Sequence, residues 1–349
     1  MELKAIRPKW KTVEHSRSEI IRAGKIIRNE FSTEKEIKEA TEVIDNWRAS
    51  HAFPLHIFYN NLRRYASAEN GFVVAERLKR LDSIIKKLKR LPRMNLWEMQ
   101  DLGGCRLIVP SIEDVYFVSN KFKDSRIRHT LKRVHDYIQE PQTSGYRSLH
   151  LVYEYHSDTV ETYNRNMQIE IQFRTHLQHL WATAVETMGL FTKTALKAGQ
   201  GEEDVKRFFL LCSAVFASIE QQPLPPNVCD DIDVIRDEIR NLNAKHKYLE
   251  FLSGIRVAVD AREKSEKKIK RGYCILILNY EHKRLRIKYF KPSEIEDANR
   301  VYDEIESSRA EDRIDAVMVR VSSFNELKTA YPNYFSDIGE FIGIVQKFM

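Results

Sequence analysis

The chain has 349 residues, of which 42% are hydrophobic, so it is long enough to form two domains with apolar cores. Its four scattered cysteines contain no CxxC pair, which argues against a disulfide framework or a zinc cluster, and the lack of an apolar leader or membrane-length run predicts a cytoplasmic protein with no membrane partner. The net charge of +7 divides into 45 Lys and Arg against 37 Asp and Glu in residues 1–270, and 12 against 13 in residues 271–349, a balance that suits an anionic substrate and is equally typical of ordinary surface variation.

The N-terminal part of the chain, residues 1–66, is predicted to be helical and to pack on the core. Thr33-Glu-Lys-Glu36 has the pattern of a capping box and opens a helix that continues to Trp47. Residues 72–91 are predicted to form one amphipathic helix, because three leucines and Ile85 fall in one apolar arc and the lysines and arginines fall opposite.

Strands and helices then alternate. The predicted strands are 104–109, 133–139, 148–156 and 167–174, and the predicted helices are 176–190 and 202–221. The strand that ends at Arg174 alternates strictly, which places Glu170, Gln172 and Arg174 on one face and apolar side chains on the other. A polar face behind a buried face suits a phosphate-handling site.

A Pro/Gly turn ends in a cluster of side chains with binding potential, Tyr146, Arg147, Ser148 and His150. An aromatic ring beside hydrogen-bonding groups suits a nucleobase held face-on with a phosphate next to it. Taken alone, a tyrosine after a glycine is more often a packed turn, and a lone strand histidine is more often a core residue.

The C-terminal third begins at a break in composition. Gln222-Pro-Leu-Pro-Pro-Asn227 opens a helix and charged linker, residues 223–270, before a second small module, residues 271–349. The module is predicted to contain strands at 273–279, 284–290 and 315–321, a helix after Pro292, a helix from the box Ser323-x-x-Glu326 and a helix at 336–348.

Five motifs occur in the order found in the synthetase domain of the RelA/SpoT family. They are Arg77-Leu-Lys-Arg-Leu-Asp-Ser83, Asp101-Leu-Gly-Gly-Cys-Arg106, Gly145-Tyr-Arg-Ser-Leu-His150, Glu170-Ile-Gln-Phe-Arg-Thr175 and Trp181-Ala-Thr-Ala-Val-Glu186. The resemblance implies an enzyme, a pyrophosphokinase that moves the β,γ-pyrophosphate of ATP onto a ribose 3′-hydroxyl. It also implies an α+β fold in which residues 67–222 form a mixed β-sheet, nucleotidyltransferase-like synthetase core flanked by helices.

The same resemblance assigns roles to individual residues. Asp101 and Glu170 are expected to hold Mg²⁺ and to activate the 3′-hydroxyl; a carboxylate at a strand end, taken alone, is usually a solvated turn residue. The residues expected to bind ATP are Arg77, Lys79, Ser83, Lys87 and Arg106. The residues expected to bind the acceptor are Tyr146, Arg147, Ser148, His150, Gln172 and Arg174. A solvent-facing basic stripe is the alternative for the lysines of the predicted helix.

The acceptor itself is less well determined by the sequence. Many relatives carry Pro-Lys before the Gly-Tyr turn, and here the pair is Pro141-Gln142, which weakens the case for a free guanosine nucleotide. A basic track is predicted to contact tRNA through Lys9, Lys11, Arg126, Arg128, Lys132 and Arg133. Scattered surface cations are the alternative.

The C-terminal module carries Tyr331-Pro-Asn-Tyr334, which alone is usually packing or loop structure. A synthetase core fused to a small C-terminal α/β, pseudo-zinc-finger-like domain with this motif resembles the CapRel family of fused toxin–antitoxin proteins. That resemblance implies pyrophosphorylation of the tRNA 3′-CCA end, autoinhibition by Tyr331 and Tyr334, an antitoxin module that docks on its own core, and release by a phage protein such as a major capsid protein. The alternatives are a small alarmone synthetase that makes (p)ppGpp or pppApp, and a catalytically silent RNA-binding module.

Overall fold

The computed structural model describes residues 10–66, 71–192, 202–254, 258–259, 271–279, 282, 284–307, 314–321, 323–331 and 338–349. The strands are β1 (Val73–Leu78), β2 (Gly103–Val109), β3 (Thr130–Asp136), β4 (Leu149–Glu154), β5 (Gln168–Thr175), β6 (Ala258–Val259), β7 (Gly272–Asn279), β8 (Arg284–Phe290) and β9 (Ile314–Val321). Within these residues they form one sheet in the order β3-β4-β5-β2-β1-β9-β7-β8-β6. β5 is parallel to β2 and β6 is parallel to β8, while the other neighbours are antiparallel. The predicted mixed α+β fold is confirmed.

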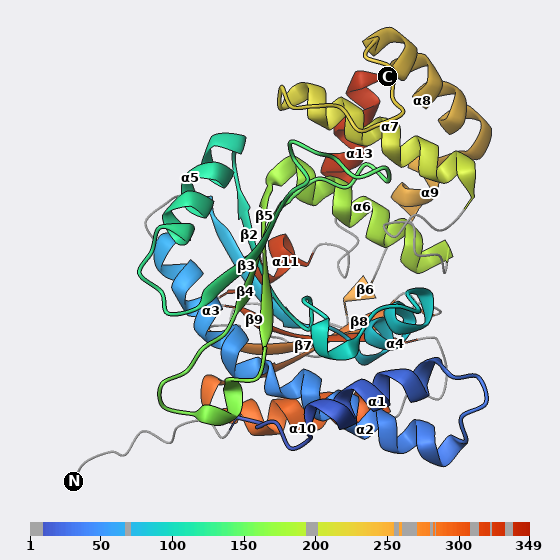
Figure 1. Cartoon of the computed structure of the whole chain (residues 1–349). Helices are drawn as coiled ribbons and strands as arrows, with labels where there is room; N and C mark the ends of the chain where they lie inside the picture. The colour runs from blue at the N-terminus through green and yellow to red at the C-terminus, as the bar shows by residue number, and fades with distance from the viewer. Residues whose placement is uncertain are drawn as a thin grey trace.

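Helices cover both faces of this sheet. They are α1 (Arg17–Arg28), α2 (Glu34–Ser50), α3 (Ala52–Ala66), α4 (Leu81–Arg90), α5 (Ile112–Lys123), α6 (His176–Thr192), α7 (Glu203–Ile219), α8 (Ile232–His246), α9 (Tyr248–Gly254), α10 (Ile295–Ser307), α11 (Phe324–Ala330) and α13 (Gly339–Phe348), with short 3-10 turns η1 (Leu96–Glu98), η2 (Glu161–Tyr163) and η5 (Pro292–Glu294). Figure 1 shows α3 and α5 on one face of the core strands and α6 and α11 on the other. None of the helices that the structure describes is long and apolar enough to cross a bilayer.

The main core lies beneath the apolar face of β2, β4 and β5. Ile169, Ile171 and Phe173 of β5 are fully buried there against α3 and α5, through residues such as Phe58 and Phe122. Because side chains of a strand alternate between faces, this burial commits the intervening polar residues to the opposite face. The alternation that the sequence predicted for β5 is therefore confirmed.

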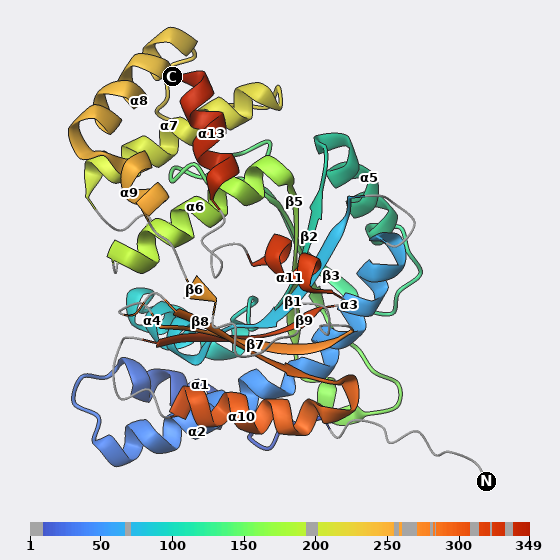
Figure 2. The same cartoon turned by 180° about the vertical axis from the view of Figure 1, so that it is seen from behind.

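A second core lies among the helices of the other face. Phe209 and Phe216 of α7 pack with Trp181 of α6 and with Phe341 of α13, the C-terminal helix. Figure 2 shows α13 lying across α6 and α7, far along the chain from both. The last helix of the chain is therefore built into the helical layer that backs the polar face.

The predicted helix over 72–91 is only partly correct. Val73 and Val74 pair with Ile108 and Leu107 in β1, and the helix α4 begins at Leu81, after Arg80 has taken an extended conformation. β-branched residues that pack on a neighbouring strand favour a strand over the helical pattern of the leucines. Arg77 therefore lies on a strand, and Lys79 in the link to α4.

The C-terminal strands extend the core sheet. β9 pairs with β1 through Glu76 with Arg320 and through Arg77 with Val319, and β7 and β8 continue outward. α10 lies against β7 and β9 beside α2, with Arg48 of α2 3.6 Å from Asp303 of α10. The strands of residues 271–349 thus share one sheet with the strands of residues 67–222. The single helix predicted within residues 223–270 is two helices, because Lys247 adopts a left-handed conformation with φ 57° between α8 and α9.

Candidate functional site

The polar face of the sheet brings the predicted site residues into register. Arg106 of β2 lies opposite Gln172 of β5, which lies opposite His150 of β4. In the adjacent row Gly104 lies between Arg77 of β1 and Glu170 of β5. The glycine contributes no side chain, so the space between that arginine and that carboxylate stays open.

Asp101 lies just before β2 and is held by two lysines. Lys79 Nζ donates to Asp101 Oδ2 at 2.6 Å, and Lys87 Nζ donates to Oδ1 at 2.9 Å. Burial alone would raise the pKa of the Asp101 carboxyl, but the two ammonium groups outweigh it and hold this pKa well below its ordinary value. The carboxylate is therefore ionised, and both predicted ATP-binding lysines converge on it.

Glu170 belongs to a closed ring of hydrogen bonds. Its Oε1 lies 3.1 Å from His150 Nδ1, and His150 Nε2 lies 2.7 Å from the Tyr146 hydroxyl. Arg174 Nη2 donates to that hydroxyl at 2.6 Å and to Gln172 Oε1 at 2.6 Å, and Gln172 Nε2 donates back to Glu170 Oε2 at 2.6 Å. Burial would raise the pKa of Glu170, but His150 outweighs it and lowers this pKa. These hydrogen bonds fix a carboxylate, an imidazole and a phenol relative to one another.

Tyr146 is buried in this arrangement. Its side chain is 5% exposed, and the Arg174 guanidinium carbon lies 5.2 Å from the centre of its ring. Tyr137 and His150 meet the same ring edge-on. The aromatic surface predicted to stack on the acceptor base is thus covered by an arginine, which must move before a base can take its place.

Two buried arginines have N–H groups without a partner. Arg106 Nε and Arg174 Nε and Nη1 are buried and form no hydrogen bond within the described residues. Burial lowers the pKa of Arg106 to about 10. Buried donors without partners are costly, and guanidinium groups match phosphate geometry, so these residues fit the phosphates of ATP.

The carboxylates also fit a divalent cation. Mg²⁺ commonly takes one or two protein carboxylates together with phosphate oxygens and water, and Asp101 and Glu170 supply that number. Their oxygens are occupied by lysine, histidine and glutamine side chains, so the cation would bind by exchanging with these partners. The described residues contain no cluster of three or more His, Cys, Asp or Glu that could hold a metal.

The C-terminal segment lies against the part of this polar face that carries Arg77 and Arg106. Arg106 Nη1 donates to the carbonyl oxygen of Ala330 at 3.4 Å, and the Tyr331 hydroxyl donates to the carbonyl oxygen of Glu76 at 3.0 Å. Tyr331 is buried, which raises the pKa of its hydroxyl, while the nearby charges of Arg106 and Arg77 act to lower it. His179 of α6 contacts the carbonyl oxygen of Thr329 at 2.9 Å. Tyr334 lies outside the described residues.

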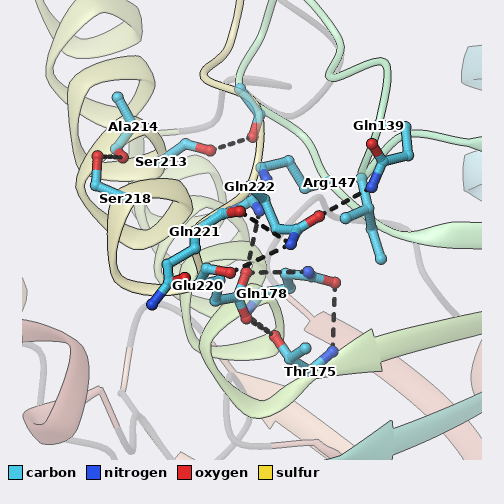
Figure 3. Close-up of polar contacts among 12 residues, drawn as sticks. Gln139, Arg147, Thr175, Gln178, Ser213, Ala214, Ser218, Glu220, Gln221 and Gln222 are labelled. Carbon is cyan, nitrogen blue, oxygen red and sulfur yellow. Dashed lines mark hydrogen bonds and ion pairs between the residues drawn. The ribbon is translucent and has the colours of Figure 1, made fainter. Parts of the chain in front are cut away.

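The turn that carries Tyr146 is supported from behind by α6 and α7 (Figure 3). Gly145 has φ 85°, and a β-carbon there would lie 3.0 Å from Ser213, whose hydroxyl donates to the Gly145 carbonyl at 2.6 Å. Arg147 points away from the ring of hydrogen bonds that includes Glu170. It pairs with Glu220 at 3.1 Å, and both side chains are buried. Gln178 Nε2 donates to the same carboxylate at 3.1 Å.

Sequence reasoning missed this support. Ser213 lies on α7 and Glu220 is its C-cap residue; the sequence assigned no role to either, and they meet the turn only through tertiary packing. A polar residue among the apolar side chains of α7, as Ser213 is, was the available signal. Ser148, a predicted acceptor ligand, donates to the carbonyl oxygen of Phe173 at 3.0 Å. Its hydroxyl therefore also stabilises the sheet by bonding to β5.

The predicted tRNA-contacting residues lie at the surface of the described part of the chain. Arg128 pairs with Asp158, and Lys132 pairs with Glu154 at 3.0 Å. Arg126 and Lys11 are exposed, and Lys9 lies outside the described residues. With the Gln100 amide oriented so that its oxygen faces Arg133, the guanidinium donates to it at 3.0 and 3.2 Å. Ser83, a predicted ATP ligand, is half-buried on α4.

Part of the chain is similar to known proteins. Residues 76–193 match the family model described as the region found in RelA / SpoT proteins. The chain is 36% identical over 112 residues to the GTP pyrophosphokinase YjbM of Bacillus subtilis (strain 168), covering 32% of this chain and 52% of that protein. It is 39% identical over 114 residues to the GTP pyrophosphokinase YwaC of the same organism, covering 31% and 52%. The chain thus spans about half the length of these curated relatives.

Part of the chain also resembles solved structures. The small alarmone synthetase 2 of Bacillus subtilis has 25% identity and a TM-score of 0.42, covering 51% of this chain and 94% of that one. The small alarmone synthetase 1 of the same organism, bound to its product pppGpp, has 24% identity and a TM-score of 0.42, covering 56% and 97%. The sequence matches therefore concern the part of the chain that includes residues 76–193, which is similar to the RelA / SpoT region and to two GTP pyrophosphokinases.

Proposed function

We propose that the chain is an ATP-dependent pyrophosphokinase that acts on the 3′-CCA end of tRNA and is restrained by its own C-terminal segment. The observation that carries the activity is the pairing of two ionised carboxylates, Asp101 and Glu170, with buried guanidinium groups on one face of the sheet. The names of the matched relatives, both GTP pyrophosphokinases, support the same reaction class.

The reaction asks for charge neutralisation and alignment. The acceptor 3′-oxygen attacks the β-phosphorus of ATP, the bond between that phosphorus and the oxygen bridging to the α-phosphate breaks, and AMP leaves. Glu170, oriented by His150 and Gln172, accepts the hydroxyl proton. Arg106, Lys79 and Lys87 neutralise the triphosphate. Mg²⁺ held by Asp101 and Glu170 would neutralise further phosphate charge.

A tRNA end is the favoured acceptor for two reasons. Pro141-Gln142 stands where many relatives carry Pro-Lys, so a cation that would suit a free guanosine nucleotide is missing. The surface near β3 carries arginines and lysines suited to an RNA backbone. The second candidate is a small alarmone synthetase that makes (p)ppGpp or pppApp, and the relatives' names favour it.

Restraint by the C-terminal segment is supported by the contact between that segment and the predicted ATP residues. Tyr331 is buried beside Arg77 and Arg106, where its flat ring would compete with an adenine bound by these residues. A CapRel-like protein would be released when a phage protein, such as a major capsid protein, binds the C-terminal segment. Inhibition of translation by modified tRNA would then restrict the phage.

The test uses the full chain and ATP labelled at the γ position. Wild-type protein, Tyr331→Ala and Tyr331→Ala/Asp101→Asn are each given deacylated tRNA or GDP. We expect Tyr331→Ala to label tRNA at least about tenfold faster than wild type, since the ring no longer competes with ATP, and the double variant to lose this label. Tyr331→Phe, which keeps the ring, serves as the matched control and should stay near wild type.

Other outcomes identify the alternatives. Label on GDP in place of tRNA would make the protein an alarmone synthetase. A folded Tyr331→Ala protein that labels neither acceptor and releases no AMP would contradict the enzymatic proposal and favour an RNA-binding module. Equal labelling of tRNA by wild type and Tyr331→Ala would contradict the restraint alone.

A further inference from the structure

A polar depression of about 550 Å³ is lined in part by residues that neighbour the two carboxylates in the sequence. Its walls come from the start of α1, from η1, from β3 and from the loop before β5, and they include Arg17, Trp97, Gln100, Arg133, Arg165 and Gln168. Gln168 precedes Glu170 by two residues on β5, so both side chains share one face at a spacing of about 7 Å. Gln100 directly precedes Asp101.

The depression is strongly cationic. Three guanidinium groups line it against one carboxylate, that of Glu98, which is exposed. Among the residues that the structure describes, no carboxylate is recorded in an ion pair with Arg17 or Arg165, and Arg133 donates only to the amide oxygen of Gln100. Guanidinium groups without an acidic partner are suited to bind phosphate oxygens in pairs.

The walls are formed in advance of any ligand. Asn164 anchors the loop through two hydrogen bonds with the Ser157 backbone, at 2.7 and 2.6 Å. Asn166 has φ 56° and donates to the carbonyl oxygen of Trp97 at 3.2 Å. Arg165 projects from between these two anchors. A site whose groups are already fixed loses little conformational entropy when a ligand binds.

An aromatic ring forms part of the wall. Trp97 is stacked on Trp47 with ring centres 4.7 Å apart and planes 10° apart, and the Arg17 guanidinium lies over it at 5.9 Å. Arginine, amide and aromatic side chains together are the groups that bind single-stranded nucleic acid. The volume is within the range of sites for whole ligands of drug size and larger than a lone phosphate requires.

We propose that this depression binds the RNA acceptor strand upstream of its terminal nucleotide, through the phosphodiester backbone and one base. The inference rests on the proposed function and deepens it. A terminal nucleotide held by Tyr146 with its 3′-hydroxyl at Glu170 uses the ring of hydrogen bonds described above, and the strand that precedes it requires a second site on the same face. A free nucleotide acceptor has no such strand.

The test measures binding by the full chain in the absence of ATP. The probe is the fluorescently labelled single-stranded trinucleotide CCA, and AMP is the competitor because it is a nucleotide with no strand preceding it. Arg165→Ala and Arg17→Ala should each weaken CCA binding about tenfold, since each removes a hydrogen bond from a charged group. The slope of log affinity against log salt should fall by about 0.7 for each lost phosphate contact. Affinity for AMP should stay unchanged.

Arg22→Ala is the matched control, because Arg22 is exposed on α1 and does not line the depression. Equal CCA affinity in Arg165→Ala, Arg17→Ala and wild type would overturn the inference, as would an equal loss in Arg22→Ala. Loss of AMP binding with CCA binding intact would assign the depression to the phosphate of a free nucleotide and also overturn it. Pyrophosphorylation of tRNA is measured separately, so a failure of the proposed enzymatic function can be told apart from a failure of this binding site.

Discussion

The carboxylate of Glu220 lies behind the turn that carries Tyr146. We expect it to set the position of Tyr146 without touching a substrate. It pairs with Arg147, and both side chains are nearly fully buried. Arg147 Nε and Nη1 have no hydrogen-bond partner among the described residues, so the ion pair is the main compensation for this buried charge. Removing one partner of a buried pair costs more than removing both, since a lone charge remains.

We therefore expect Glu220→Ala to lower the free energy of unfolding by about 3–5 kcal/mol. The acceptor KM should rise more than kcat falls, because the displaced turn carries a binding residue. Urea unfolding and steady-state kinetics on the Tyr331→Ala background measure the two effects. Gln139→Ala, at the exposed end of the same network, is the control. A variant that loses stability with an unchanged acceptor KM would restrict Glu220 to a structural role.

Most of the polar ring could be predicted from sequence at the level of single residues. The period-two pattern of β5 places Glu170, Gln172 and Arg174 together, because side-chain alternation is a local property of a strand. The placement of Arg147 could not be predicted, because its position in the turn allows it to face either the ring or α7. Packing against Glu220, 73 residues later in the chain, decides between them.

At the scale of elements, α13 connects the end of the chain to the helical layer. Phe341 is fully buried against Phe209 and Phe216, and Arg236 of α8 donates to the carbonyl oxygen of Phe348 at 3.0 Å. The helix follows the segment that contains Tyr331, so its docking holds that segment near the sheet.

Phe341→Ala should therefore weaken this docking by about 3–5 kcal/mol, the usual cost of removing a buried phenylalanine ring. Amide hydrogen exchange is expected to speed up in α13 and to stay slow in α7. If docking maintains the restraint, labelling of tRNA should also rise. Lys347→Ala, on the exposed side of α13, is the control. Uniformly faster exchange through α6 and α7 would instead indicate a global loss of stability.

The elements that sequence misjudged share a physical cause. The helical leucine spacing belongs to α4, and the prediction extended that helix back over β1. The valines of β1 pair with β2 and its outer edge accepts β9, so non-local pairing decides its conformation. The C-terminal strands were predicted individually at close to their observed bounds. They join the core sheet through only two described residue pairs between β1 and β9. So few pairs leave no pattern in the sequence from which the joining could be predicted.

At the scale of the whole molecule, a buried ionisable group lies where those two parts of the sheet meet. Glu76 of β1 faces Arg320 of β9 at 3.9 Å, and its Oε2 has no hydrogen-bond partner among the described residues. Burial raises the pKa of Glu76 from 4.5 to about 7, against the opposing charge of Arg320. An acid with a higher pKa in the folded state binds a proton on folding, so stability is lost as pH rises from 4.5 to about 7.

Glu76→Gln should remove this pH dependence. The variant should match wild type near pH 4 and exceed its free energy of unfolding by up to about 3 kcal/mol at pH 8, from 1.36 kcal/mol for each unit of pKa shift. Chemical denaturation at the two pH values measures the difference. A variant that is less stable than wild type at pH 8 would show that the ion pair with Arg320 outweighs the cost of burial. Glu326→Gln, on the nearby helix α11, is the control.

The junction between β1 and β9 has a consequence for any shortened form of the protein. A chain that ended before residue 271 would lack β7, β8 and β9, and β1 would then present unpaired N–H and C=O groups to solvent. Bare strands of this kind pair with other chains and promote aggregation. Loss of the C-terminal segment would therefore be expected to yield an insoluble polypeptide more readily than an unrestrained one.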